Sequence, residues 1–143
     1  MTTETLSEAD ILSAISDDKS LLLFNTIALS NSETSDILIS RLNLSRKQFY
    51  TRMSSMIKVG LIKRENSKHF LTSLGKVVYK AETMIGGALK VYWKLKAIDS
   101  LETSINTNEL PDVEHKRIVE VLIGNQEIRE IILSREKFSK TRL

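Results

Sequence analysis

The stretch LSRKQFYTRMSSMIKVGLIKR, residues 44–64, constrains the fold of this chain more than any other part of the sequence. It contains six Lys or Arg residues and no Asp or Glu, and its apolar residues recur at the spacing of one helix face. At about 100° per residue, Phe49, Met53 and Met56 point within about 60° of one another. Gly60 then interrupts the helical pattern. The stretch therefore predicts a helix over 45–59, capped by Ser45, with one side facing a core.

The opposite side of this predicted helix is polar and basic. It carries Lys47, Gln48, Thr51, Ser54, Ser55 and Lys58, and its flanks carry Arg46, Tyr50 and Arg52. Side chains of these lengths and hydrogen-bonding types reach base edges and phosphates in a major groove. A carboxylate on this side of the helix would be repelled by the phosphates of a nucleic acid. We therefore interpret the acid-free helix as one that lies against nucleic acid.

The charge of the chain is polarised only in its middle. Residues 1–36 contain seven acids and one base, whereas residues 37–81 contain ten bases and only Glu65 as an acid. From residue 99 onward nine acids accompany seven bases, an ordinary solvated mixture. A basic surface that merely keeps the protein soluble is the simpler alternative. The concentration of positive charge in one segment favours a surface that meets a polyanion.

Three shorter helices are predicted before this one. Ser7, followed by Asp10, is typical of a helix N-cap with a capping box. A second helix begins at Asp17 or Asp18, with core residues Leu22, Phe24, Ile27 and Ala28. A third extends from Glu33 or Thr34 to about Leu42, capped by Asn31 or Ser32, and the chain breaks at Asn43 and Leu44.

A β-hairpin is predicted directly after Gly60. Residues 61–64 and 68–71 form its strands, and the polar residues 65–67 form its turn. Exposed basic side chains decorate it, namely Lys63, Arg64, Lys68 and His69. A hairpin in this place corresponds to a wing that contacts the DNA backbone or the minor groove.

The run LSRKQFYTRMSSMIKVGLIKRENSKHFLTSLGKVVYKA resembles the recognition helix, wing and following helix of archaeal and bacterial winged helix-turn-helix transcriptional regulators. The matching residues are Leu44, Ser45, Phe49, Met53, Met56, Val59, Gly60, Leu61 and Ile62, followed by LTSLGK at 71–76. The similarity covers roughly residues 18–82, and its post-wing element most resembles that of archaeal regulators of ArsR-like shape. It implies a winged fold and a DNA-binding activity, although winged domains also bind proteins and RNA.

A long helix is predicted from Ser73 to about Leu101. A heptad seam runs along it, formed by Leu74, Val78, Ala81, Ile85, Ala88, Tyr92 and Leu95. A helix of about 40 Å is longer than a small winged domain needs to cover its own core. We therefore expect the rest of the seam to be buried in the interface of a homodimer. The alternative is that the helix folds back on other helices of the same chain.

Gly86 and Gly87 interrupt this seam. Each costs about 1 kcal/mol relative to Ala inside a helix, so the pair permits close backbone approach, a kink or a break. Tyr92 and Trp93 follow, and packing is the expected role of these aromatic residues rather than lining a ligand pocket. Two more helices are predicted after the polar connection that contains Pro111, the second of them capped by Asn125.

Catalytic and metal-binding motifs are missing from the sequence. There is no cysteine, and the two histidines, His69 and His115, belong to no metal-ligand pattern. No phosphate-binding loop or nucleophile elbow occurs. We therefore expect no enzymatic activity, no cofactor and no metal. The acidic N-terminus and the lack of a long apolar run predict a soluble cytoplasmic protein without a membrane partner.

The sequence as a whole predicts a mainly α fold with a small β-hairpin wing. We expect an N-terminal helical extension at 1–16, a winged helix-turn-helix domain at 17–73, and a long helix with C-terminal helices for dimerisation at 74–143. The predicted function is a homodimeric regulator of transcription that binds double-stranded DNA through helix 45–59 and wing 61–72. The alternative is a winged-helix protein-interaction module of a larger transcription or assembly complex. The predicted DNA contacts are Arg46, Lys47, Gln48, Tyr50, Thr51, Arg52, Ser54, Lys58, Lys63, Arg64 and Lys68.

Overall fold

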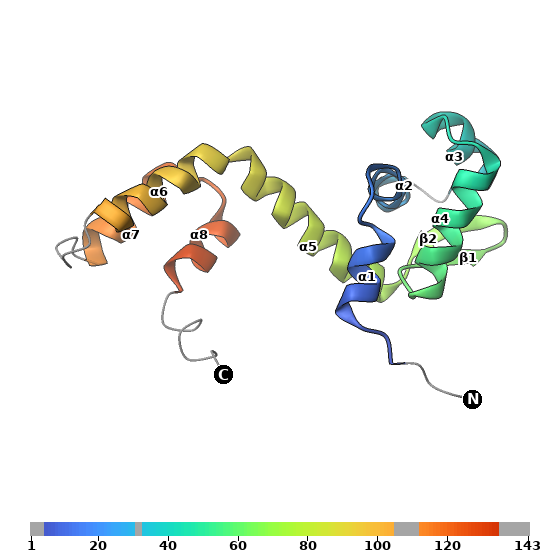
Figure 1. Cartoon of the computed structure of the whole chain (residues 1–143), viewed down its shortest axis with the longest axis horizontal. Helices are drawn as coiled ribbons and strands as arrows, with labels where there is room; N and C mark the ends of the chain where they lie inside the picture. Colours follow the sequence, from blue (N-terminus) through green and yellow to red (C-terminus); the bar gives the residue numbers. More distant parts are fainter. Residues whose placement is uncertain (1–4, 31–32, 105–111, 135–143) are drawn as a thin grey trace. The chain divides into compact units, whose positions relative to one another are not determined.

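The protein is mainly helical with one two-stranded antiparallel hairpin, as the sequence predicts (Figure 1). The computed structural model describes residues 5–30, 33–104 and 112–134. Asn31, Ser32 and the connection that contains Pro111 lie outside the described residues. Within them the elements are α1 (Glu8–Ala14), α2 (Asp18–Leu29), α3 (Ser35–Leu42), α4 (Arg46–Lys58), β1 (Ile62–Glu65), β2 (Lys68–Leu71), α5 (Ser73–Lys90), α6 (Tyr92–Ser104), α7 (Asp112–Leu122) and α8 (Gln126–Leu133).

The chain divides into two compact units, Met1–Ala81 and Glu82–Leu143. The boundary differs from the expected one at residue 73, because Val78 and Tyr79 of α5 pack against the core of the first unit. The expected extension at 1–16 also belongs to this unit, since Ala14 and Ile15 are buried in the same core.

Side-chain caps define the starts of three helices in the first unit. Ser7 and Asp10 form the predicted capping box of α1, and Ser45 and Gln48 form one at α4. Asp17 caps α2 by accepting a hydrogen bond from the Ser20 N–H at 3.2 Å. The third helix differs from expectation, because α3 begins at Ser35 and its N-cap position is held by Thr34.

The core of the first unit is formed by apolar side chains of α2, α3, α4 and the start of the hairpin. The largest side chains with less than 2% exposure are Leu23, Phe24, Leu38, Phe49, Met56, Leu61 and Ile62. The prediction that Leu22 belongs to the core is wrong, because this side chain is 52% exposed and Leu23 is buried in its place. The run of three leucines in α2 contains no periodicity by which the buried one can be chosen.

The ends of α3 and α4 share one hydrogen-bonding pattern. After α3, Asn43 adopts a left-handed conformation with φ 51°, and the Leu44 N–H donates to the Ile39 carbonyl. After α4, Gly60 takes φ 83°, and the Leu61 N–H donates to the Met56 carbonyl. Both are Schellman caps, which satisfy the last carbonyls of a helix and reverse the chain sharply. The first sets the turn between α3 and α4, and the second sets the entrance to the hairpin.

The first strand of the hairpin is shifted by one residue from its predicted position, whereas the predicted second strand, Lys68–Leu71, is confirmed. β1 begins at Ile62 instead of Leu61, and Glu65 pairs with Lys68 at its end. The turn is therefore the two residues Asn66 and Ser67, both of which have positive φ, as a type I′ turn requires. An isolated bridge between Thr34 and Lys68 also ties the hairpin to the start of α3.

Thr72 and Gly75 join the hairpin to α5. The Thr72 N–H donates to the Leu61 carbonyl at 3.0 Å, and the Thr72 hydroxyl accepts a hydrogen bond from the Gly75 N–H at 2.9 Å. This hydroxyl also donates to the Gly60 carbonyl. A Cβ at Gly75 would lie 2.1 Å from the Leu61 carbonyl oxygen, so only glycine fits there. The LTSLG sequence thus joins the hairpin to the start of α5 through these hydrogen bonds and the close approach at Gly75.

The prediction of one long helix from Ser73 to Leu101 is wrong. α5 is continuous through Gly86 and Gly87, and the interruption falls at Val91, before α6. At the interruption the Val91 N–H donates to the Ala88 carbonyl and the Leu95 N–H donates to the Val91 carbonyl, and α6 turns away from the direction of α5 (Figure 1).

The second unit has its own core. Its buried residues are Ile98, Val119, Ile123 and Ile128, from α6, from the end of α7 and the residue after it, and from α8. Asn125 caps α8 as predicted, with its side chain accepting from the Ile128 N–H. His115 is nearly buried and lies 2.5 Å from the Glu102 carboxylate, which joins α7 to α6.

Candidate nucleic-acid interface

The exposed side of α4 is the centre of the candidate site. Lys47, Thr51, Ser54 and Lys58 follow one another at intervals of four, three and four residues, which places them in one stripe along the helix. All four are exposed, whereas Phe49, Met53 and Met56 on the other side are buried. The predicted orientation of this helix in the fold is therefore confirmed.

Two arginines at the flanks of α4 bind acids of the same chain. The Arg52 guanidinium donates to the Asp17 carboxylate at 3.1 Å and to the Gln48 carbonyl at 3.3 Å, and its side chain is only 24% exposed. Arg46 lies 3.4 Å from Asp36, with both side chains well exposed. Hydrogen bonds from Ser20 and Arg52 hold the pKa of Asp17 below its ordinary value. Arg52 thus fastens α4 to the start of α2.

Gln48 and Tyr50 lie on either side of the stripe. The side-chain oxygen Oε1 of Gln48 accepts a hydrogen bond from the Ser45 N–H at 3.0 Å, so only its side-chain amide nitrogen remains to donate to a ligand. The Tyr50 ring is 47% exposed and lies edge-on to Phe49, with 5.2 Å between centroids. Each therefore combines a structural contact with an accessible polar group.

The hairpin contributes further positive charge beside α4. Arg64 and Lys68 are exposed, and neither forms an ion pair within the part of the chain that the structure describes. Lys63 is also exposed but lies 3.5 Å from Glu65 on its own strand. Contacts between α4 and β1 place these strands next to the helix (Figure 1).

The prediction that His69 is exposed is wrong. Its side chain is 3% exposed and packs edge-on against Phe49, with 6.0 Å between ring centroids. Burial lowers the pKa of His69, nearby Arg64 lowers it further, and a hydrogen bond involving the backbone of Glu33 opposes the shift. His69 is therefore a neutral packing residue that fixes the hairpin against α4. The bounds of β2 are as predicted, and the error lies in the alternation along this strand, which turns His69 toward Phe49.

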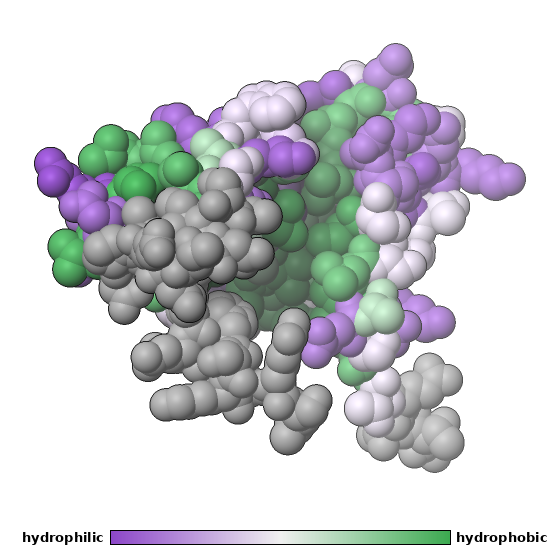
Figure 2. All heavy atoms as spheres, turned by 60° about the vertical axis from the view of Figure 1, so that its left-hand side comes forward, coloured by the Kyte–Doolittle hydropathy of each residue, from purple (hydrophilic) through white to green (hydrophobic). Residues whose placement is uncertain are grey.

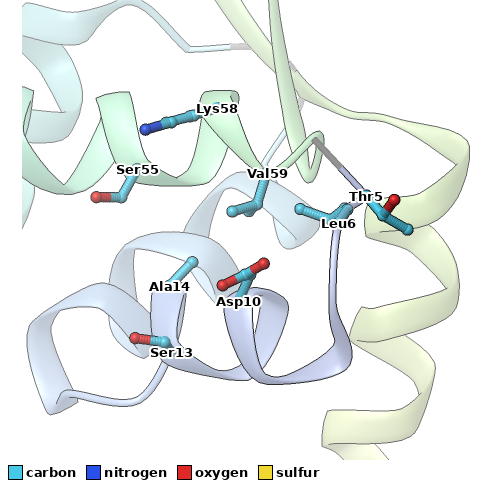
Figure 3. A pocket seen from close by; sticks show the side chains of 8 residues that line it. All are labelled: Thr5, Leu6, Asp10, Ser13, Ala14, Ser55, Lys58 and Val59. Atoms are coloured by element: carbon cyan, nitrogen blue, oxygen red, sulfur yellow. The ribbon is translucent and has the colours of Figure 1, made fainter. Parts of the chain in front are cut away.

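The N-terminal helix borders the far end of the stripe. α1 packs beside α4, and a polar hollow of about 530 Å³ lies between them, lined by Thr5, Leu6, Asp10, Ser13, Ala14, Ser55, Lys58 and Val59 (Figure 3). Hydrogen bonds from the backbone and hydroxyl of Ser7 lower the pKa of Asp10, and Lys58 adds a smaller effect of the same sign. The negative charge of Asp10 therefore limits the positive potential at this end of α4.

The residues of the predicted dimer seam have different environments. Val78 packs on the core of the first unit, whereas Ala88 and Leu95 pack on the core of the second. Leu74, Ala81, Ile85 and Tyr92 are exposed. The structure therefore does not present the seven positions as one free surface, because intrachain packing uses three of them.

Sequence reasoning did not find the structural roles of Arg52, His69 and Thr72. Their roles depend on partners that are distant in the sequence. Only Thr72 was part of a motif noted in the sequence, the LTSLG element. Within residues 5–30, 33–104 and 112–134, no three His, Asp or Glu side chains are placed to hold a metal ion. No helix in these ranges is long and apolar enough to span a bilayer.

Comparison of the chain with protein-family models, with functionally characterised proteins and with solved structures gives no significant match. The functional interpretation therefore depends on the geometry and charge of the site itself.

Proposed function

We propose that this chain is a winged helix-turn-helix regulator of transcription that binds double-stranded DNA as a homodimer. α3 and α4 serve as the helix-turn-helix, α4 as the recognition helix, and the β1–β2 hairpin as the wing. The observation that carries the proposal is the acid-free, exposed stripe of α4, in which two hydroxyl side chains lie between two lysines beside a basic hairpin.

The predicted cationic contacts fall into two groups according to their ion pairs. Lys47, Lys58, Arg64 and Lys68 are exposed cations that form no ion pair within the described residues, so they are the proposed phosphate contacts. Arg46, Arg52 and Lys63 each lie beside an acid of the same chain and contribute less. The proposed base contacts are Gln48, Tyr50, Thr51 and Ser54.

The number of free cations sets the expected salt dependence. Each phosphate contact lowers the slope of log K against log salt concentration by about 0.9, so four contacts predict a slope of about −3.6 per protomer. Binding should therefore be moderate in affinity and strongly weakened by salt. A single removed contact should change the slope by about 0.9 per protomer.

The test is fluorescence anisotropy of the full chain with a labelled random duplex over a salt series. Lys47→Ala and Arg64→Ala should weaken binding to all duplexes alike and flatten the slope. Lys116→Ala is the matched control, because Lys116 is an exposed lysine of the second unit whose ammonium lies 3.9 Å from Glu120. Selection from a random library should show that Thr51→Val alters sequence preference while leaving the slope unchanged.

Binding that is absent at low salt, or equal in all these variants, would contradict the proposal. The basic face would then serve another partner, as in the alternative of a winged-helix interaction module. An exposed apolar side chain on α4 gives that alternative some support, since Ile57 is 40% exposed.

A further inference from the structure

The hollow between α1 and α4 in the first unit borders the basic stripe at Lys58. It has a volume of about 530 Å³, and Thr5 and Leu6 also belong to its lining (Figure 3). Ligand sites in proteins commonly have volumes of about 300–1,000 Å³. Apolar and hydrophilic residues lie next to one another on the face of the molecule in Figure 2, and the hollow combines both kinds. A ligand that fits it therefore needs both polar and apolar groups.

One acid and one base line the hollow from different helices. Asp10 belongs to α1 and its side chain points toward α4, whereas Lys58 belongs to the last turn of α4 (Figure 3). The Ser7 N–H donates to Oδ2 of Asp10 at 3.0 Å and so orients the carboxylate. Hydrogen bonds from Ser7 hold the pKa of Asp10 below its ordinary value, so this carboxylate is charged at neutral pH. The hollow thus presents an oriented anion on one wall and an ammonium on the other.

These two charges do not neutralise each other within the chain. No ion pair joins Asp10 to Lys58, and Lys58 forms none with any other acid in residues 5–30, 33–104 and 112–134. Lys58 still lowers the pKa of Asp10, by less than Ser7 does, so the two charges lie near each other without direct contact. A molecule that carries both charges can bridge them.

We propose that this hollow binds an aliphatic α-amino acid, whose ammonium donates to Asp10 and whose carboxylate accepts from Lys58. Both contacts are charge-assisted hydrogen bonds, which are stronger than those between neutral groups. Ser13 and Ser55 add one hydroxyl from each helix, and each hydroxyl can donate to the carboxylate of the ligand. The polar groups of the hollow therefore match both ends of a zwitterion.

The lining also selects against other classes of small ligand. Asp10 repels a phosphorylated or other purely anionic ligand, and Lys58 repels a simple amine. Leu6 is 43% exposed, so its side chain has apolar surface to bury against a ligand. The apolar lining residues are Leu6, Ala14 and Val59. An aliphatic side chain on the ligand fits this part of the hollow.

Occupation of the hollow acts on DNA binding through Lys58. This part of the inference rests on the proposed function, in which Lys58 is one of four unpaired cations that contact phosphate. A carboxylate bound to Lys58 removes this cation from the DNA contacts, so the salt slope should change from about −3.6 to about −2.7 per protomer. At about 0.1 M monovalent salt the same loss weakens DNA binding roughly eightfold per protomer. Because linkage is reciprocal, bound DNA should weaken amino-acid binding by the same factor.

The first test titrates the isotopically labelled full chain with L-leucine and L-valine and follows the amide chemical shifts by NMR. We expect saturable shifts at residues 10–14 and 55–59. Two analogues of leucine test its charges separately, since isocaproate lacks the ammonium and isoamylamine lacks the carboxylate. Each analogue should bind at least about tenfold more weakly than leucine, because one charge of the hollow then has no partner. No saturable shift with either amino acid, or equal binding of leucine and its analogues, would overturn the proposal.

Two substitutions in the lining test the assignment of the charges, each with a matched control. Lys58→Gln removes the cation, and Lys116→Gln makes the same change at an exposed lysine of the second unit. Asp10→Asn removes the anion, and Glu8→Gln removes another acid from the first turn of α1. Leucine binding should be lost in Lys58→Gln and Asp10→Asn and kept in the two controls. Asp10 also caps α1, so circular dichroism of each variant establishes that the helical content is retained. Lys58 has no such structural role, and unchanged leucine binding in Lys58→Gln would contradict the proposal even if Asp10→Asn unfolds.

DNA binding measured with and without leucine separates this inference from the proposed function. A chain that binds leucine as predicted but never binds duplex DNA supports the amino-acid site and contradicts the regulator. A chain that binds DNA with the predicted salt slope but shows no shift with either amino acid overturns the site and leaves DNA recognition intact. Binding of both, with a salt slope that leucine does not change, would refute the coupling through Lys58.

Discussion

Replacement of Gly75 by alanine is the substitution whose effect the structure determines most directly. The added Cβ would lie 2.1 Å from the Leu61 carbonyl oxygen and 3.4 Å from the Leu71 Cβ. Because real Cβ atoms keep at least 3.0 Å from such neighbours, the start of α5 must move by about 0.9 Å away from the hairpin. That oxygen also accepts the hydrogen bond from the Thr72 N–H, so the movement strains the junction at the same point.

The expected loss of stability follows from two opposing effects. Overpacking costs about 1–3 kcal/mol, and a clash with backbone belongs at the upper limit of about 3 kcal/mol. Alanine regains about 1 kcal/mol of helix propensity. The net loss is about 2 kcal/mol, which corresponds to a fall in Tm of roughly 8–16 °C for a unit of this size.

Urea and thermal unfolding followed by circular dichroism measure this loss, and hydrogen exchange at the Thr72 amide locates it. Gly87→Ala is the control in the same helix, because its Cβ makes only ordinary contacts. We expect Gly87→Ala to be neutral or stabilising. If Gly75→Ala unfolds at the same urea concentration as the wild type, the close approach of α5 to the hairpin is not present in solution.

Two further predictions concern the same region. Thr72→Val should lower the free energy of unfolding by about 1–2 kcal/mol, because the hydroxyl both caps α5 and binds the carbonyls of Gly60 and Leu61. Thr72→Ser should retain most of that stability in a urea titration, and equal midpoints for the two variants would contradict this role. Burial lowers the pKa of His69 below its ordinary 6.5, so the unfolded state binds the proton first and stability falls as pH decreases below about 7. The urea midpoint of the wild type should therefore fall between pH 7.5 and 5.5 by more than that of His69→Phe, and parallel shifts would exclude His69 as the cause.

The sequence alone predicted those structural features that depend on interactions between residues close together in the chain. The capping box at Ser7, the N-cap at Ser45, the glycine stop at Gly60 and the apolar stripe of α4 all depend on residues within a few positions of one another. Asn125 was found as a cap for the same reason. These features were predicted correctly because helix geometry relates near neighbours to one face or one terminus.

The candidate site could be predicted only in part. The stripe from Lys47 to Lys58 follows from periodicity, and its exposure is as expected. The acids that bind Arg46 and Arg52 come from α3 and from the cap of α2, and no local pattern indicates them. The sequence therefore could not separate paired from unpaired cations of the segment, whereas the structure does.

Taken alone, the sequence determined the helical class of this protein, the hairpin after Gly60 and the acid-free face of α4, because each depends on backbone preference and short-range spacing. Tertiary structure alone decided that Leu23 rather than Leu22 is buried, that His69 lies under the hairpin, and that Ala88 and Leu95 belong to an internal core. A single residue of register, as in the hairpin, exchanges buried for exposed side chains. Packing between distant segments selects that register, and it leaves the apolar side chains of Ile85, Leu89 and Trp93 exposed.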